Sequence, residues 1–414
     1  MSLEPNYRHY TKRISEFLAT TLSPSKNRGY IAEIDQLRAM AAMLVLLYHG
    51  VQLFNPNVGI TTTNPVLAII VEGHSGVGLF IVLSGFILTL GALGNSVSYK
   101  PFLIARILRI YPMLLVCLVV AINVGSSNLI NVLTTVLPFN GAAVTGGIPG
   151  SFSAMFWAVA VEFQCYLIFP FLLMFSNERG SRFLFRVIAI AICLRLLATL
   201  TGDANPRDIG HWTIVGRIDQ FCLGIIAARL YVGKGLQKIR PLWFLPAALT
   251  VAAMLWLFNQ AGGFPSVSRW KIVWPDVEGA VWACFIVTYI SAGRLLPGAI
   301  SHLTSKLGEI SYSFYLIHFA VINMVIKNSM ALPATGHSNL DAIATTLFIV
   351  FPITAAIALL TYHTIELPFL RMRPKYVGAR DGDGESEILR PIPRSDVQGK
   401  SQSTRLLASK QDHP

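Results

Sequence analysis

Long apolar runs separated by short polar segments follow one another from about residue 37 to residue 364. A helix needs about 20 apolar residues to cross the hydrocarbon core of a bilayer. The pattern predicts ten membrane spans, near residues 37–54, 66–94, 102–124, 152–175, 183–200, 212–231, 241–258, 272–291, 308–330 and 341–364. The second run is longer than one span needs, so we expect it to tilt or to extend beyond the membrane. The predicted fold is an all-α, polytopic membrane bundle.

Composition agrees with this pattern and excludes other classes of protein. Of the 414 residues, 53% are hydrophobic and 13% are charged, and the mean hydropathy is +0.57. Ordinary soluble domains have about 25% charged residues, so a typical soluble enzyme, a coiled coil and a disordered chain are excluded. The five cysteines stand singly in apolar segments without a CxxC pair, which predicts neither a disulfide framework nor a metal site.

The basic residues are distributed unevenly between the predicted loops. Lysine and arginine precede the first span and follow spans two, four, six, eight and ten, whereas loops 55–65, 125–151 and 331–340 have none. By the positive-inside rule, both termini are predicted to be cytoplasmic. The net charge of +12 is therefore mainly a topology signal, and we do not expect nucleic-acid binding. Arg207, Arg269 and Lys271 are exceptions to the alternation.

Polar segments flank the predicted membrane domain, residues 31–376. Residues 1–30 are basic, and Tyr7, Tyr10, Ile14 and Phe17 recur at helical spacing. This segment is predicted to be either a short helix on the membrane surface or a cytoplasmic arm. Residues 377–414 are rich in glycine, serine and balanced charges, which predicts a disordered cytoplasmic tail.

Two ionisable residues interrupt the first predicted span. Arg38 and His49 are eleven residues apart, and three helical turns take about 10.8 residues, so their side chains share one face. They lie about 16 Å apart along the helix axis, which puts Arg38 near the cytoplasmic surface and His49 well inside the membrane. Arg38 is either functional or a snorkelling anchor. His49 is either a packing residue or a base that works near neutral pH.

Two further candidates come from spans three and four. Arg106 and Arg109 in RILRIYP are spaced i, i+3, and paired guanidinium groups suit phosphates, although both could also be topology anchors. Glu162 interrupts the apolar run FWAVAVEFQCYLIFP. A carboxylate inside a membrane needs a partner or a wet cavity, so we expect Glu162 to have a function or to form a structural ion pair.

The remaining polar residues in spans are weaker candidates. Arg217 and Asp219 in GRIDQF are expected to pair with each other or with Glu162. His318 ends LGEISYSFYLIH and Glu366 lies in TYHTIELPF, and either could be structural. His74 is interpreted as an ordinary polar residue near the outer surface. Ser84 stands in SGF, a site for close helix packing, and lacks the GxSxG elbow of a hydrolase nucleophile.

These segments together resemble the membrane acyltransferases of type 3, bacterial ten-helix proteins that O-acylate sugars. IDQLRAMAAMLVLLYH is similar to the family's opening motif, in which Arg38 and His49 occupy the arginine and the histidine. RILRIYP resembles the segment whose arginines contact the acyl-CoA donor, and GVGLFIVLSGF resembles the SGF segment. FWAVAVEFQCYLIFP resembles the tryptophan-to-glutamate motif, with Glu162 on the glutamate. LGEISYSFYLIHF and TIELPF resemble the two C-terminal motifs, and the matches run from about residue 31 to residue 370.

The resemblance implies transfer of an acyl group, most often acetyl, from acyl-CoA to a hydroxyl of a glycan or glycolipid in the bacterial inner membrane. Acetyl-CoA would be the donor substrate, bound by Arg38, Arg106 and Arg109, and no metal is implied. His49 would be the base or would form an acyl-histidine intermediate. Glu162 would orient His49 or bind the sugar.

Other functions remain open at this point. One is acyl transfer to a small lipophilic acceptor, such as a macrolide, or transfer of a succinyl group. Another is transport of a glycan or drug, although transporters often have inverted repeats and matching broken helices, which are not clear in this chain. A non-catalytic membrane scaffold would not require Glu162 and His49 within the membrane.

Overall fold

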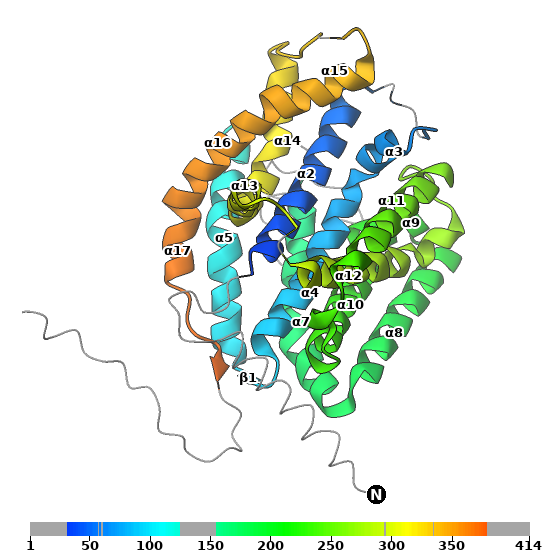
Figure 1. Cartoon of the computed structure of the whole chain (residues 1–414), viewed down its shortest axis with the longest axis vertical. Helices are drawn as coiled ribbons and strands as arrows, with labels where there is room; N and C mark the ends of the chain where they lie inside the picture. The colour runs from blue at the N-terminus through cyan, green and yellow to red at the C-terminus, as the bar shows by residue number, and fades with distance from the viewer. Residues whose placement is uncertain are drawn as a thin grey trace, which may run out of the picture. The chain divides into compact units, whose positions relative to one another are not determined.

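The computed structural model describes residues 31–378, except residues 57, 59–60, 125–154, 294 and 334 (Figure 1). The predicted N-terminal arm, nearly all of the predicted tail, and the whole basic-free loop 125–151 lie outside the described residues. In the part that is described, the chain is almost entirely helical, which confirms the predicted all-α class.

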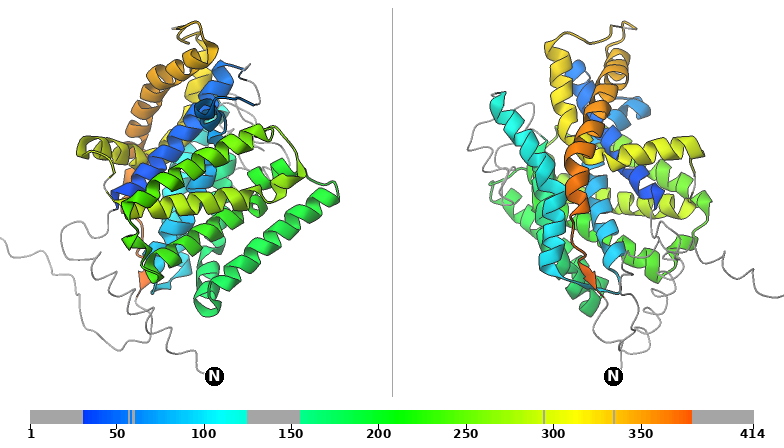
Figure 2. Two further views of the ribbon diagram at one scale, coloured as in Figure 1. Left: turned by 45° about the vertical axis from the view of Figure 1, so that its right-hand side comes forward. Right: turned by 90° about the vertical axis from the view of Figure 1, so that its left-hand side faces the viewer.

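Ten helices of twelve or more residues form most of the described bundle. They are α2 (Ala32–Phe54), α4 (Gly76–Ala92), α5 (Tyr99–Asn123), α7 (Phe156–Arg179), α8 (Ser181–Leu200), α10 (Ile214–Gly233), α11 (Phe244–Gln260), α12 (Trp274–Ala292), α13 (Gly298–Glu309) and α14 (Ser311–Lys327). The shorter elements include α3 (Pro65–Val71), η1 (Gly73–Ser75), α9 (Pro206–Trp212), η3 (Leu236–Lys238), η4 (Pro241–Trp243) and η5 (Arg269–Ile272). The C-terminal elements α15 (Ser338–Thr345), η6 (Thr346–Val350), α16 (Phe351–Thr361), η7 (Tyr362–Glu366) and α17 (Leu367–Arg371) form one continuous 34-residue helical span. This span lies on the opposite side of the bundle from α8 (Figures 1 and 2).

Seven helices of the described chain are long and apolar enough to cross a membrane. The count rises to eight when α13 and α14, which meet at a bend of 75°, are taken as one span. The bend is visible in Figure 1, where α13 is seen almost end-on. The predicted spans 212–231 and 272–291 correspond to α10 and α12, which have 20 and 19 residues and contain three and two charged residues. The chain is therefore a multi-pass membrane protein.

The stretch 66–94 is not the single tilted or extended span that its length predicts. Helix α3 ends at Val71, η1 follows, and α4 begins at Gly76. The break coincides with close contact against α2, where a Cβ on Gly73 would lie 2.3 Å from the carbonyl oxygen of Leu44. The polar sequence at the break, which includes Glu72, is thus buried at a helix junction instead of lying along one helix.

Close backbone contacts hold α4 against α10 in the middle of the bundle. A Cβ on Gly85 would lie 2.3 Å from the carbonyl oxygen of Phe221, and one on Gly224 would lie 2.1 Å from that of Val82. Small residues allow membrane helices to approach in this way. The close packing predicted for the SGF segment is confirmed.

The two short strands join distant parts of the chain. β1 (Ser96–Val97) lies between α4 and α5, and it pairs antiparallel with β2 (Val377–Gly378), which follows α17. This pairing places Tyr376 beside the first turns of α5, where its ring contacts Phe102 at a centroid distance of 5.3 Å.

Candidate active site

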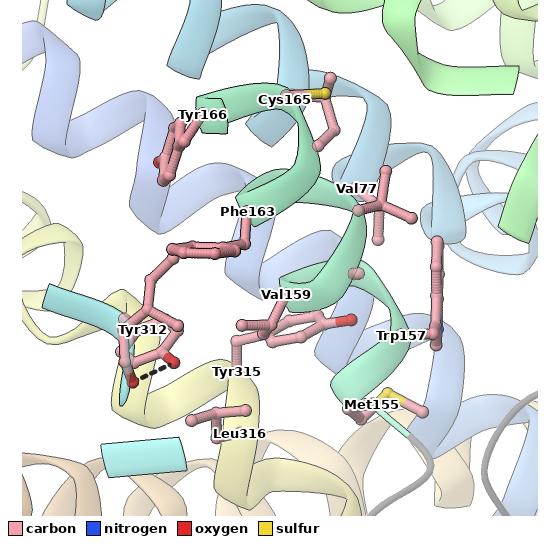
Figure 3. Close-up of a cluster of buried hydrophobic side chains, with 14 of the residues drawn as sticks. Val77, Met155, Trp157, Val159, Phe163, Cys165, Tyr166, Tyr312, Tyr315 and Leu316 are labelled. Atoms are coloured by element: carbon pink, nitrogen blue, oxygen red, sulfur yellow. Dashed lines mark hydrogen bonds between the residues drawn. The ribbon is translucent and has the colours of Figure 1, made fainter. Parts of the chain in front are cut away.

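Four of the candidate residues line one cavity. It has a volume of about 830 Å³, including the part open to solvent, and lies among α2, α4, α5, α7 and α14. Arg38, Arg106, Arg109 and Glu162 all contribute to its wall, although they come from three helices. Figure 3 shows Tyr166, Tyr312 and Tyr315, which also line it, within the same buried cluster.

Glu162 is the acidic group of this cavity. Ser84 Oγ donates a hydrogen bond to Glu162 Oε1 at 2.7 Å, and the Tyr166 hydroxyl donates to the same oxygen. These two donors satisfy the requirement that a carboxylate within a membrane has polar partners. Among the described residues, His49 is not a hydrogen-bond partner of Glu162.

The guanidinium of Arg106 is enclosed by aromatic rings. It lies 5.5 Å from the centroids of Phe102 and Tyr376 and 5.6 Å from that of Tyr166. Arg106 is only 8% exposed, and its Nε has no hydrogen-bond partner among the described residues. A snorkelling anchor keeps its charged end in water, so the burial of Arg106 disfavours that interpretation.

Arg109 and Arg38 have different surroundings. Arg109 interacts electrostatically with Glu366 most strongly, and then with Tyr166 and Glu162. Glu366 itself is 1% exposed, and Ser313 donates a hydrogen bond to its Oε1. Arg38 Nη1 donates to Asp35 Oδ1 at 2.9 Å, and 27% of its side chain is exposed. Glu366 thus lies within electrostatic range of Arg109, which the distance between the two residues in sequence does not reveal.

His49 does not line the cavity, but lies one layer of side chains behind it. Tyr315 is in the cavity wall, and the rings of Tyr315 and His318 are 5.6 Å apart. The rings of His318 and His49 are 5.3 Å apart, and Phe319 contacts His49 edge-on at 5.3 Å. His318, one of the weaker sequence candidates, therefore contacts both a residue of the cavity wall and His49.

Arg217 and Asp219 pair with other residues, so the expectation that they pair with each other or with Glu162 is wrong. Arg217 Nη1 lies 3.2 Å from Glu278 Oε2, and Asp219 Oδ2 lies 2.6 Å from Arg195 Nη1. Residues two apart on a helix do not face each other, which explains why the two side chains of GRIDQF diverge. Arg195 and Glu278 are buried members of these pairs that the sequence interpretation missed.

A second, smaller cavity of about 320 Å³ lies around α9, η5 and the start of α12. His74 and His211 are in its wall, their rings are 5.4 Å apart, and Phe264 contacts both at 4.7 Å. His74 is only 6% exposed, so it is buried within the protein, and its expected position near the outer surface stays a prediction. The signal for its burial was the apolar sequence on both sides of it.

Lys271, one of the exceptions to the charge alternation, also lines this second cavity. Its Nζ donates to the carbonyl oxygens of Gly263, Phe264 and Ser266 at 2.6, 3.0 and 2.6 Å. Burial lowers the pKa of Lys271 to about 8. This lysine therefore holds the loop between α11 and η5 and does not report membrane orientation.

A comparison with known protein families identifies the family of this chain. A family model described as "Acyltransferase domain" (Acyl_transf_3) matches residues 31–363. The chain belongs to this acyltransferase family. The match includes α2, with Arg38 and His49, and extends to η7, three residues before Glu366. No solved structure matches the chain.

Several curated relatives of this chain have names that refer to acyl transfer. A Staphylococcus aureus (strain COL) protein named "Putative O-acetyltransferase SACOL0978" is 25% identical over 395 residues, which cover 85% of this chain. The matched segment spans 60% of that relative's length. "Putative membrane-bound transacylase BcsY" of Komagataeibacter xylinus is 28% identical, covering 71% of this chain and 73% of the relative. "Acyltransferase MdmB" of Streptomyces mycarofaciens is 26% identical, covering 70% and 79%. The chain is thus a multi-pass membrane protein of the acyltransferase family.

Proposed function

We propose that this acyltransferase transfers an acetyl group from acetyl-CoA to a hydroxyl of a glycan or glycolipid. The observation that carries the proposal is the cavity that gathers Arg38, Arg106, Arg109 and Glu162, with His49 one side chain behind its wall. The relatives named as O-acetyltransferases support acetyl as the acyl group and oxygen as its acceptor.

The chemistry of the cavity suits the donor. Acetyl-CoA carries a 3′-phosphate and a diphosphate, and guanidinium groups bind phosphates with charge-assisted, often bidentate, hydrogen bonds. The Nε of Arg106, which has no hydrogen-bond partner among the described residues, is a donor for such a bond. The arginines would hold the phosphates while the pantetheine arm carries the thioester inward.

His49 would supply acid and base chemistry. The acceptor hydroxyl oxygen attacks the thioester carbonyl, and His49 takes the hydroxyl proton as the new C–O bond forms. The C–S bond then breaks, and the proton passes to the thiolate of CoA. Base catalysis of this kind typically contributes about 10²–10⁴-fold to the rate. An acyl-histidine intermediate is the alternative route through the same residue.

The membrane arrangement is part of the proposal. We place the protein in the bacterial inner membrane with ten spans, counting α10, α12 and the bent pair of α13 and α14 in addition to the seven apolar helices. The alternation of basic loops supports cytoplasmic termini. The arginine-lined cavity would then receive its donor from the cytoplasm, where CoA is made.

A complementation experiment tests the function. Surface glycans of a deletion strain are analysed for O-acyl groups by NMR after expression of wild type, His49→Ala or His302→Ala. His302 is an exposed histidine of α13 and serves as the control. We expect wild type and His302→Ala to restore an O-acetyl group and His49→Ala to fail while present in the membrane. If wild type restores no acyl group, the glycan acceptor is wrong, and if His49→Ala restores it, the role of His49 is wrong.

Donor binding is tested separately by thermal stabilisation of the purified protein. A ligand at 100 times its Kd stabilises the folded state by about 2.7 kcal/mol. We expect Arg109→Gln to weaken acetyl-CoA binding by about 10- to 100-fold, since bonds to charged groups contribute about 1.5–3 kcal/mol. Arg186→Gln, at an exposed position of α8, is the matched control. Equal stabilisation of both variants would exclude Arg109 from the donor site.

A further inference from the structure

The hydrogen bonding of His318 defines which of its nitrogens carries the proton. Nδ1 lies 2.6 Å from the carbonyl oxygen of Tyr315, one turn earlier in α14. A carbonyl oxygen only accepts hydrogen bonds, so Nδ1 must be the protonated nitrogen. In the neutral imidazole, Nε2 then bears a lone pair and is an acceptor.

This acceptor is buried without a partner. His318 is 1% exposed, and Nε2 has no hydrogen-bond partner among the described residues. Buried polar atoms without partners are rare in native structures, and each requires an explanation. The unpartnered nitrogen is therefore an unused acceptor next to the proposed site.

His49 is the ring best suited to supply the missing donor. Its centroid lies 5.3 Å from that of His318, and the two ring planes are inclined by 31°. The other rings around His318 are those of Tyr315 and Phe319, at 5.6 and 6.5 Å. Phe319 has no donor, and Tyr315 already faces the donor cavity. This centroid separation leaves room for a hydrogen bond from an N–H of His49 to Nε2 of His318 when the two ring edges face each other.

We propose that His318 is a positioning residue whose Nε2 accepts a hydrogen bond from His49 and thereby fixes the tautomer and orientation of that ring. The inference rests on the proposed function, because it assigns His318 a part in the same transfer. The hydrogen bond made by one nitrogen of a histidine determines the protonation of the other. With one N–H directed to His318, the second nitrogen of His49 keeps its lone pair for the acceptor hydroxyl.

The proton balance of the transfer is unchanged by this role. His49 takes the hydroxyl proton on its free nitrogen and becomes an imidazolium, while its other N–H stays bonded to His318. The same proton then passes to the CoA thiolate as the C–S bond breaks. His318 neither gains nor loses a proton, so it acts on the rate by orienting His49 and by stabilising its charged form.

Two substitutions separate this role from a purely structural one. His318→Asn keeps an amide N–H near the position of Nδ1, so the bond to Tyr315 is retained, but it removes the acceptor at the position of Nε2. His318→Gln places an amide oxygen near that position and keeps the acceptor. Asn323→Ala is the control, since Asn323 makes a similar bond within α14, from Nδ2 to the carbonyl oxygen of Phe319 at 2.7 Å.

The variants are compared in nanodiscs, with radiolabelled acetyl-CoA as donor and surface glycan from the deletion strain as acceptor. We expect His318→Asn to lower kcat by about 10- to 100-fold, as for partners that orient a functional histidine, with the KM for acetyl-CoA unchanged. His318→Gln should recover several-fold of this loss, and Asn323→Ala should resemble wild type.

The outcomes distinguish this inference from the proposed function. Wild-type kcat in His318→Asn overturns the positioning role, and so does an equal loss in the Asn and Gln variants. Loss of acetyl-CoA stabilisation in both variants shows that His318 is structural, which also overturns it. In each of these cases, the proposed function still holds if wild type transfers the acetyl group and His49→Ala does not. Absence of transfer by wild type overturns the function itself.

Discussion

Replacing Arg195 tests whether the charges of α8, α10 and α12 are structural. This arginine is fully buried in α8, and its Nη1 and Nη2 lie 2.6 and 2.7 Å from Asp219 Oδ2 and Asp276 Oδ2. Its Nε also donates to the carbonyl oxygen of Ile272 at 2.7 Å. Arg195→Gln leaves Asp219, which is 0% exposed, without its counter-charge. Breaking a buried pair in this way costs about 3–5 kcal/mol, so we expect a large loss of stability.

The assay is thermal unfolding of the purified protein, followed by tryptophan fluorescence, together with kcat per folded molecule. We expect Arg195→Gln to have a lower Tm and a kcat near that of wild type, because none of these residues lines the arginine cavity. The exposed Arg186, nine residues earlier on the same helix, provides the control Arg186→Gln, which should change neither quantity. A variant with normal Tm and abolished transfer would show that these charges serve the reaction and would make Asp219 a candidate functional residue.

Three further predictions concern packing, pH and the serine of the cavity. Gly224→Ala should destabilise the protein by about 1–3 kcal/mol in thermal unfolding, because the added Cβ would collide with the Val82 carbonyl oxygen. The control is Gly91→Ala, whose added Cβ meets no other atom and should leave the stability unchanged. Burial lowers the pKa of Lys271 to about 8, below the unfolded value of about 10.4, so the unfolded chain binds more protons between these values. The contribution of Lys271 to the free energy of unfolding therefore rises with pH from about 8 to 10.4. Unfolding measured at several pH values should show this rise in wild type but not in Lys271→Met. Ser84→Ala should retain measurable acetyl transfer in the radiolabel assay, since Ser84 only donates a hydrogen bond to Glu162, whereas complete loss would indicate a serine nucleophile.

The sequence predicts where the helices lie along the chain better than it predicts how they pack against one another. Apolar runs report burial in lipid or protein, so the all-α class and most helix positions follow directly from them. The junction at Glu72 and the 75° bend between α13 and α14 depend on contacts with other helices. Glu72, Gly73 and His74 within an apolar run are the signal that could have indicated the first break.

The same limit applies to the candidate site. Spacing and resemblance identify the three arginines and Glu162, and the structure brings all four to one cavity. Their partners cannot be read from spacing, because a buried charge is matched across helices that are distant in sequence. Arg217 pairs with a glutamate 61 residues away, and Glu162 is bound by a serine 78 residues away. Arg195 and Glu278 interrupt apolar runs as plainly as Glu162 does, and the rule that such charges need partners could have identified both.

The central claim is that His49 is required for acetyl transfer from a donor bound at the arginine-lined cavity. The most direct measurement is transfer of radiolabel from acetyl-CoA to surface glycan of the deletion strain by purified wild type, His49→Ala and His302→Ala. We expect label in the glycan with wild type and His302→Ala, and none with His49→Ala, although acetyl-CoA still stabilises that variant. Equal labelling by His49→Ala, or labelling by no variant, would contradict it.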